Sequence, residues 1–252
     1  MGLRKPRILA YYSVCVVTIP VYALVIILLS RASFATRYAI ALRWIKLQHW
    51  ALRNLVGLDY EVDGLEHIPD GAAILYCKHQ SMIECITTQL FLPPQTWVLK
   101  RELLWVPMFG WALARLNPIA IDRRAGRSAV EQITEQGEAL FKHGIWVVIF
   151  PEGTRMPLAQ TRAYGMGGAV LASKTGVPVI PLAHNAGRYW LKGRFDILPG
   201  RFRMRVGPPI DTRNLSAEEV NRRAKAWINQ AMAEIDGPEE EVARPHRNGP
   251  TP

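Results

Sequence analysis

Acidic residues are missing from the first 58 residues of the chain. This stretch has no Asp or Glu, whereas Arg and Lys recur throughout it. Over all 252 residues, the chain has 31 Lys and Arg and 21 Asp and Glu, which gives a formal net charge of +10. That total suits lipid head groups, acidic substrates and nucleic acid equally well. A basic segment beside apolar runs, however, is what an anionic membrane surface attracts, by about 1 kcal/mol per basic residue. The distribution of charge therefore predicts contact with lipid.

Several chemical signatures are also absent. The three cysteines, Cys15, Cys77 and Cys85, lack metal-ligand spacing and cannot all pair, which favours a reducing compartment and predicts no metal site. No G-x-S-x-G sequence is present, so the chain has no serine nucleophile elbow. No nucleic-acid motif with interleaved aromatic residues occurs, and we predict no nucleic-acid partner.

The longest apolar run covers residues 8–30 and has no charged residue. As a helix rising about 1.5 Å per residue, it is long enough to cross a hydrocarbon layer about 30 Å thick, with a kink expected at Pro20. A secretory signal is the alternative, with Ser33-Phe34-Ala35 as its cleavage site. The run exceeds the roughly 7–15 apolar residues of such signals, which argues against that interpretation.

A second N-terminal segment, residues 34–56, has the periodicity of a basic amphipathic helix. Apolar side chains including Tyr38, Ala41 and Ile45 share one face, and basic side chains lie opposite: Arg43, Lys46, His49 and Arg53. Both flanks of the preceding apolar run are basic, so the positive-inside rule does not favour one clean crossing. We predict that residues 1–57 form a membrane-associated, re-entrant helix pair, with a single span as the alternative.

From residue 58 onward, short apolar runs alternate with helical stretches, which is typical of an α/β domain with a central sheet flanked by helices. We predict this domain over residues 58–237 and a disordered tail over residues 238–252, which are rich in Pro and charge. Expected strands are 60–62, 72–77, 97–99, 118–121, 145–150 and 179–183, with a hairpin of 195–198 and 202–206. Expected helices are 82–91, 106–116, 127–142, 168–175 and 217–235, the last with a capping box at Ser216 and Glu219.

One candidate for catalysis lies directly after the expected strand that ends at Cys77. There, His79 precedes a helix start and Glu84 follows five residues later. Ligands of α/β sheets bind at such strand ends, and imidazole has the pKa of a general base near neutral pH. Glu84 can reach back to orient His79. Ser81 and Glu84 also have the S-x-x-E spacing of a capping box, so a purely structural role stays open.

Three other segments follow predicted strands. Phe150-Pro151-Glu152-Gly153-Thr154-Arg155 is typical of a substrate loop, because Gly allows close approach of a ligand and Arg binds phosphate; an exposed Glu152–Arg155 ion pair is the alternative. Ile119-Ala120-Ile121-Asp122-Arg123 ends in charge and is either a phosphate site or a solvated surface. Val177-Pro178-Val179-Ile180-Pro181 indicates a buried strand.

Together and in this order, the four blocks resemble those of the glycerolipid acyltransferase family, and in particular its 1-acyl-sn-glycerol-3-phosphate (lysophosphatidic acid) acyltransferases. The resemblance covers roughly residues 58–211, and the ordered set is specific where each block alone is not. It implies the glycerolipid acyltransferase-like fold behind membrane-anchoring helices. It also implies transfer of a fatty-acyl chain from acyl-CoA or acyl-acyl carrier protein to the 2-hydroxyl of 1-acyl-sn-glycerol 3-phosphate, giving phosphatidic acid without a further cofactor.

The resemblance assigns roles by position. It makes His79 and Glu84 the catalytic pair, and Arg123 the main phosphate ligand of the acceptor. It implies a membrane location with the active site on the cytoplasmic face, which is the inner or plasma membrane if the source is bacterial. The remaining residues implied to bind substrate are Glu152, Gly153, Thr154 and Arg155, with Lys100 as an additional phosphate candidate.

The chain departs from the family pattern at two places. The family commonly has Asp where this chain has Glu84, and basic residues where this chain has Ala163-Tyr164-Gly165-Met166. Other interpretations remain open at this point: another lysolipid acceptor, such as a lyso-ornithine lipid or a different lysophospholipid, and a non-enzymatic basic membrane-binding protein. A metal triad of His79, Glu84 and His184 is a further alternative that the spacing does not demand.

Overall fold

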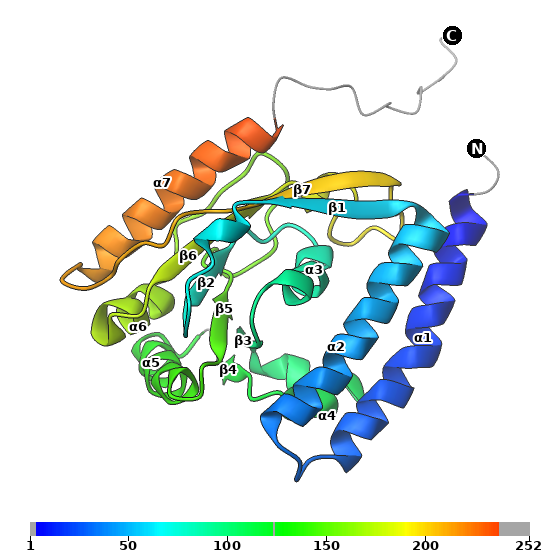
Figure 1. Cartoon of the computed structure of the whole chain (residues 1–252), viewed down its shortest axis with the longest axis horizontal. Helices are drawn as coiled ribbons and strands as arrows, with labels where there is room; N and C mark the ends of the chain where they lie inside the picture. The colour runs from blue at the N-terminus through cyan, green and yellow to red at the C-terminus, as the bar shows by residue number, and fades with distance from the viewer. Residues whose placement is uncertain (1–3, 123, 237–252) are drawn as a thin grey trace.

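The computed structural model describes residues 4–122 and 124–236 (Figure 1). Arg123 and the tail predicted at residues 238–252 lie outside these residues. The predicted α/β fold is confirmed: a seven-stranded sheet is covered by helices on both faces.

The sheet has the order β1-β7-β6-β2-β5-β3-β4. All neighbouring strands run parallel except β6 and β7, which are antiparallel. Because both faces are covered, the central strands are apolar throughout rather than alternating. The strands are β1 (Leu58–Asp63), β2 (Ile74–Cys77), β3 (Gln95–Lys100), β4 (Ile119–Ile121), β5 (Trp146–Ile149), β6 (Val179–His184) and β7 (Gly200–Val206).

Successive side chains along a strand point to opposite faces of the sheet and belong to two separate hydrophobic cores. From β2, Ile74 and Tyr76 enter the core beneath α5 (Arg127–Phe141), α6 (Gly167–Thr175) and α7 (Ala217–Asp236). Leu75 and Cys77 enter the opposite core, which is closed by α1 (Arg4–Leu28), α2 (Phe34–Ala51), α3 (Ile83–Phe91) and α4 (Phe109–Ala114). Figure 1 shows α1 and α2 as an antiparallel pair on the side away from α7. The short helical turns are η1 (Leu52–Val56), η2 (Leu65–His67), η3 (Arg101–Trp105) and η4 (Ala186–Arg188).

The N-terminal helix pair is joined by polar contacts. Trp44 Nε1 and Gln48 Nε2 both donate to Thr18 Oγ1, over 3.0 and 3.1 Å. In α2, Tyr38, Ala41 and Ile45 are buried, as the periodicity predicted, and the basic residues Arg43 and Lys46 are exposed. Of the other two predicted basic residues, His49 is half-buried and Arg53, in η1, is exposed. The inner face of α2 thus packs on the α/β domain through α3.

The outer face of α1 remains uncovered. Val17, Val21, Leu24 and Leu28 are exposed, spaced as one helical stripe. Within the described residues, α1 is the one helix long and apolar enough to cross a membrane. It continues through Pro20, and its two ends are both tied to the domain. Arg4 pairs with Asp196 at one end, and α1 packs against α4 near the other.

The hairpin predicted from residues 195–198 and 202–206 is wrong. β7 is already paired on one side with β1 and on the other with β6, so it has no free edge for residues 195–198. Those residues instead form a loop that packs on α1, where Tyr12 Oη donates to the Phe195 carbonyl. The predicted helix over residues 106–116 also begins later, at Phe109, because Pro107 and Met108 interrupt it; Met108 has a φ of 62°.

Gly168, near the start of α6, provides a test of this packing. A Cβ there would lie 2.6 Å from Tyr76 Oη and 2.7 Å from Ile149 Cδ1. We expect Gly168→Ala to lower the free energy of unfolding, because an overpacking cost of about 1–3 kcal/mol exceeds a helix-propensity gain of about 1 kcal/mol. Urea unfolding in detergent measures the difference.

Gly165→Ala is the matched control for this change. The Cβ at position 165 would meet only the Pro151 carbonyl oxygen, at 3.6 Å, which is an ordinary contact. Equal stability of the two variants would contradict the packing described for α6.

Candidate active site

His79 and Glu84 are brought into direct contact. β2 ends at Cys77, and the chain turns through residues 78–82 before α3 begins at Ile83. This turn lets His79 Nδ1 donate to Glu84 Oε1 over 2.7 Å. With Nδ1 committed to the carboxylate, Nε2 is the ring nitrogen available to take a proton.

Glu84 Oε1 accepts from the backbone as well. Gln80 N–H and Ser81 N–H donate to it over 3.1 and 3.0 Å, which is the glutamate half of a capping box. The serine half is missing, because Ser81 Oγ donates to the Trp190 carbonyl and α3 is capped by Met82. Glu84 can therefore both orient His79 and stabilise the start of α3, because the same oxygen accepts from the imidazole and from the backbone before the helix. The carboxyl group is fully buried, and its Oε2 has no hydrogen-bond partner among the described residues.

The charge of Glu84 is stabilised by its neighbours. Burial by itself raises its pKa, but the nearby His184 and His79 imidazoles and the His79 hydrogen bond outweigh burial and lower the pKa to about 2. Glu84 is therefore ionised at neutral pH. A buried carboxylate beside His79 stabilises the imidazolium that forms when the ring accepts a proton.

Phe150, the residue that follows β5, stacks on the face of the His79 ring. The two rings stack with centroids 4.0 Å apart and planes at 25°. The backbone carbonyl of His79 accepts from Met156 N–H over 2.7 Å. Two of the four sequence blocks, around His79 and around Glu152, are thus joined at the imidazole.

A second histidine, His184 at the end of β6, lies behind the pair. Its Nε2–H donates to the Lys78 carbonyl over 2.6 Å, and its Nδ1 accepts from Ala186 N–H over 3.2 Å. Burial lowers the pKa of His184, and the Glu84 carboxylate acts in the opposite direction. Both nitrogens are occupied by the backbone, so His184 fixes the chain just before His79.

These contacts argue against the metal triad of His79, Glu84 and His184. His184 Nε2 lies 4.0 Å from Glu84 Oε1 and would have to give up a backbone hydrogen bond to bind a metal. His79, Glu84 and Cys85 do have possible ligand atoms within 4.8 Å of one another. A metal bound there would compete with the hydrogen bonds to Glu84 Oε1.

Glu152 lies in a buried ion pair rather than in an exposed pair with Arg155. Lys78 Nζ is 2.6 Å from Glu152 Oε1 and also donates to the Gln160 carbonyl over 2.7 Å. The two side chains are only 4% and 1% exposed. Glu152 Oε2 is buried without a hydrogen-bond partner among the described residues. The pair joins the end of β2 to the loop after β5.

The other predicted substrate residues lie around the same opening. Arg155 and Lys100 line a pocket together with His79, although Lys100 Nζ is also 3.1 Å from Glu102. Gly153 has a φ of 70°, which favours glycine, and Thr154 is half-buried. Arg123, the residue expected to bind the acceptor phosphate, lies outside the described residues.

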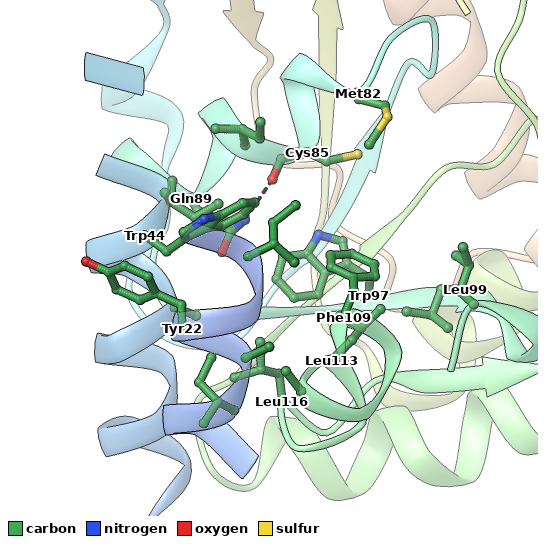
Figure 2. Close-up of a pocket in the computed structure, with 18 of the residues that line it drawn as sticks. Tyr22, Trp44, Met82, Cys85, Gln89, Trp97, Leu99, Phe109, Leu113 and Leu116 are labelled. Atoms are coloured by element: carbon green, nitrogen blue, oxygen red, sulfur yellow. Dashed lines mark hydrogen bonds between the residues drawn. The ribbon is translucent and has the colours of Figure 1, made fainter. Parts of the chain in front are cut away.

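The pocket, with a volume of about 360 Å³, extends from His79 between the N-terminal helices and the sheet. Figure 2 shows Tyr22 and Trp44 of the helix pair on one side of it, and Trp97, Phe109 and Leu113 on the other. Its lining is almost entirely apolar apart from His79, Arg155, Lys100 and Gln89. Such a lining suits a hydrocarbon chain, with the polar groups gathered near His79.

Sequence reasoning gave Lys78 no role in this site, considered His184 only as a metal ligand, and included Phe150 only as the first residue of the substrate loop. A lysine at the end of a buried strand was the available signal for Lys78, since buried Lys is rare unless it is paired. Tyr164, in the segment that departs from the family pattern, is half-buried with its ring against Tyr76 and below Lys225 Nζ, which lies 5.7 Å from the ring centroid.

The buried pair gives a stability prediction. We expect Lys78→Met to lower the free energy of unfolding by about 3–5 kcal/mol, because it leaves the Glu152 carboxylate buried without its cation. The double variant Lys78→Met/Glu152→Gln should recover part of that loss. Urea unfolding followed by circular dichroism in detergent measures both.

Lys174→Met is the matched control. Lys174 forms an exposed ion pair with Glu138, with side chains 61% and 45% exposed, and such pairs contribute about 0–1 kcal/mol. A loss no larger in Lys78→Met than in this control would show that the buried pair does not stabilise the loop.

The chain is similar to known acyltransferases over most of its length. Residues 59–185 match the model of the Acyltransferase family. A 1-acyl-sn-glycerol-3-phosphate acyltransferase from Pseudomonas aeruginosa is 43% identical over 216 residues, which are 84% of each chain. The alpha form of that enzyme from Mus musculus is 31% identical over 67% of this chain and 60% of its own length.

A solved structure agrees in fold. The 1-acyl-sn-glycerophosphate acyltransferase PlsC from Thermotoga maritima has a TM-score of 0.77 and 25% identity, covering 94% of this chain and 97% of that one. The resemblance predicted from the four blocks is therefore confirmed, and the chain belongs to the acyltransferase family.

Proposed function

We propose that the chain transfers a fatty-acyl group from a thioester donor, acyl-CoA or acyl-acyl carrier protein, to the 2-hydroxyl of 1-acyl-sn-glycerol 3-phosphate. One observation supports this most directly: the His79–Glu84 pair opens into an apolar pocket that also contains Arg155 and Lys100. The names of the relatives supply the acceptor and the reaction type.

His79 is the general base in this proposal. Nε2 takes the proton of the acceptor 2-hydroxyl while the oxygen attacks the thioester carbonyl. Collapse of the tetrahedral intermediate breaks the C–S bond, and the departing thiolate takes the proton back from the imidazolium. Glu84 keeps Nδ1 protonated and balances the transient positive charge. Phosphatidic acid and the free thiol leave, and no acyl-enzyme forms.

Substrate binding follows from the charges around the pocket. The cations Arg155 and Lys100 hold the acceptor phosphate, together with Arg123 as the sequence predicts. The apolar lining receives a hydrocarbon chain. Gly153 and Thr154 shape the loop beside the phosphate. Glu152 acts mainly through Lys78, because its carboxylate is buried in that pair.

The membrane is the proposed location, with the active site on the cytoplasmic face. The exposed stripe on α1 supports insertion into lipid, and the basic surface of α2 supports attraction to anionic head groups. Contacts at both ends of α1 with the domain favour a helix pair in one leaflet over a single crossing, because a crossing would carry one end away from the domain.

The proposed base gives the first activity prediction. We expect His79→Ala to lower kcat at least about 10²–10⁴-fold while membrane attachment persists. The assay uses vesicles containing lysophosphatidic acid and radiolabelled acyl-CoA. His143→Ala, at an exposed histidine after α5, is the matched control and should keep its activity. Full activity of His79→Ala would refute the mechanism.

Glu84→Gln separates the two roles of this side chain. Glutamine keeps an oxygen for the Gln80 and Ser81 N–H groups but removes the negative charge that balances the imidazolium. The variant should therefore unfold close to the parent and lose kcat by at least about tenfold with little change in KM, as expected for an interaction made in the transition state.

Phosphate recognition gives a third activity prediction. Arg155→Met should raise KM for lysophosphatidic acid by about 10- to 100-fold, because a charged hydrogen bond contributes about 1.5–3 kcal/mol. Activity on 1-monoacylglycerol, which lacks the phosphate, should change little. Arg127→Met, an exposed arginine paired with Glu131 on α5, is the control.

Assaying the parent protein with a panel of lysolipid acceptors identifies the acceptor class. If a lyso-ornithine lipid or another lysophospholipid were the better acceptor for the parent, the proposed substrate would be wrong while the base mechanism stood. Running the panel with both acyl-CoA and acyl-acyl carrier protein identifies the donor.

A further inference from the structure

The segment formed by η3, residues 106–108 and α4 exposes an unusual set of apolar side chains. Trp105 is 68% exposed and Trp111 51% exposed. We call this set the α4 apolar surface; its members are Leu103, Trp105, Val106, Phe109 and Trp111. Large exposed apolar patches on soluble proteins are rare and mark contacts with lipid or with other molecules.

The backbone is built to keep this surface outward. Met108 adopts a φ of 62°, an unfavourable conformation for its side chain, and so separates η3 from α4. At Gly110, a Cβ would lie 2.5 Å from the Leu103 carbonyl oxygen, so the two helical turns pack backbone to backbone. Leu104, Met108 and Leu113 of this segment pack into the core, and its other large apolar side chains face outward.

The α4 apolar surface adjoins the uncovered face of α1. α4 packs against α1, and Arg37 Nε at the start of α2 donates to the Arg115 carbonyl after α4 over 2.6 Å. In Figure 1, α4 lies beside the end of α1 that leads into α2. The exposed stripe of α1 and the α4 apolar surface therefore belong to neighbouring elements on one side of the sheet.

We propose that the α4 apolar surface is a second membrane-contacting element, inserted in the same leaflet as α1. Its partner is a phospholipid surface. Two exposed tryptophans suit the boundary between head groups and acyl chains, where indole rings concentrate, and the exposed Arg115 suits anionic head groups. The inference rests on the proposed membrane association through α1.

This placement connects the bilayer to the pocket. Leu103 and Phe109 belong to the α4 apolar surface and also line the pocket that leads to His79. α1 supplies Ile19, Ala23 and Ile26 to the same pocket. Both elements that contact lipid are thus walls of the pocket, so a hydrocarbon chain can pass from the leaflet without crossing water.

Tryptophan fluorescence with brominated lipids tests the proposal on the full chain. Trp105→Phe/Trp111→Phe keeps the surface apolar and removes only its indoles, whereas Trp227→Phe removes a half-buried indole on α7 as the matched control. Each protein is bound to vesicles of phosphatidylcholine and phosphatidylglycerol, with or without bromine on the acyl chains. The parent-minus-variant spectrum reports the removed indoles.

We expect the emission of Trp105 and Trp111 to shift to the blue on vesicles and to be largely lost with brominated lipid. The Trp227 emission should be unaffected. If Trp105 and Trp111 stayed unquenched while the protein as a whole was quenched, α1 would bind the membrane and the inference would be wrong.

Two further outcomes are distinguishable. A protein that neither sediments with vesicles nor loses emission would refute the proposed membrane association itself. A blue shift of Trp105 and Trp111 that depends on protein concentration and ignores bromine would show that a second copy of the chain covers the surface, which also overturns the inference.

Discussion

The single oxygen Oε1 of Glu84 is the point on which the site depends. It accepts a hydrogen bond from the His79 imidazole and two more from the backbone at the start of α3. Because the same atom fixes the loop and the ring, the geometry of the base is set by the fold rather than by a flexible side chain. The Glu84 side chain reaches this position by turning back from the first turn of α3.

Around that oxygen, buried polar contacts hold the ends of separate strands together. The Lys78–Glu152 pair joins β2 to the loop after β5, and His184 joins β6 to the Lys78 carbonyl. Each group would be costly to bury alone, and together they leave few other arrangements for the loops. This rigidity matters for acyl transfer, because positioning of the hydroxyl, the base and the thioester supplies much of the rate.

The helix pair completes the site as well as facing lipid. α1 and α2 form one side of the pocket, and α4 with β3 forms the other. The catalytic domain alone would leave this pocket open to water. In the proposed function, one face of α1 contacts the leaflet and its other face lines the pocket, so lipid contact and substrate binding are physically linked.

The sequence by itself determined the α/β class, most strand positions, the amphipathic face of α2 and the approach of Glu84 to His79, because these depend on local periodicity and on the order of the blocks. It left the role of Glu84 undecided and misassigned the hairpin at residues 195–198. Only the tertiary structure decided that β7 pairs with β1 and β6, that Glu152 faces Lys78, and that His184 holds the chain before His79. Those contacts join residues far apart along the chain, and no local pattern determines which strands meet at the sheet edge where the charges gather.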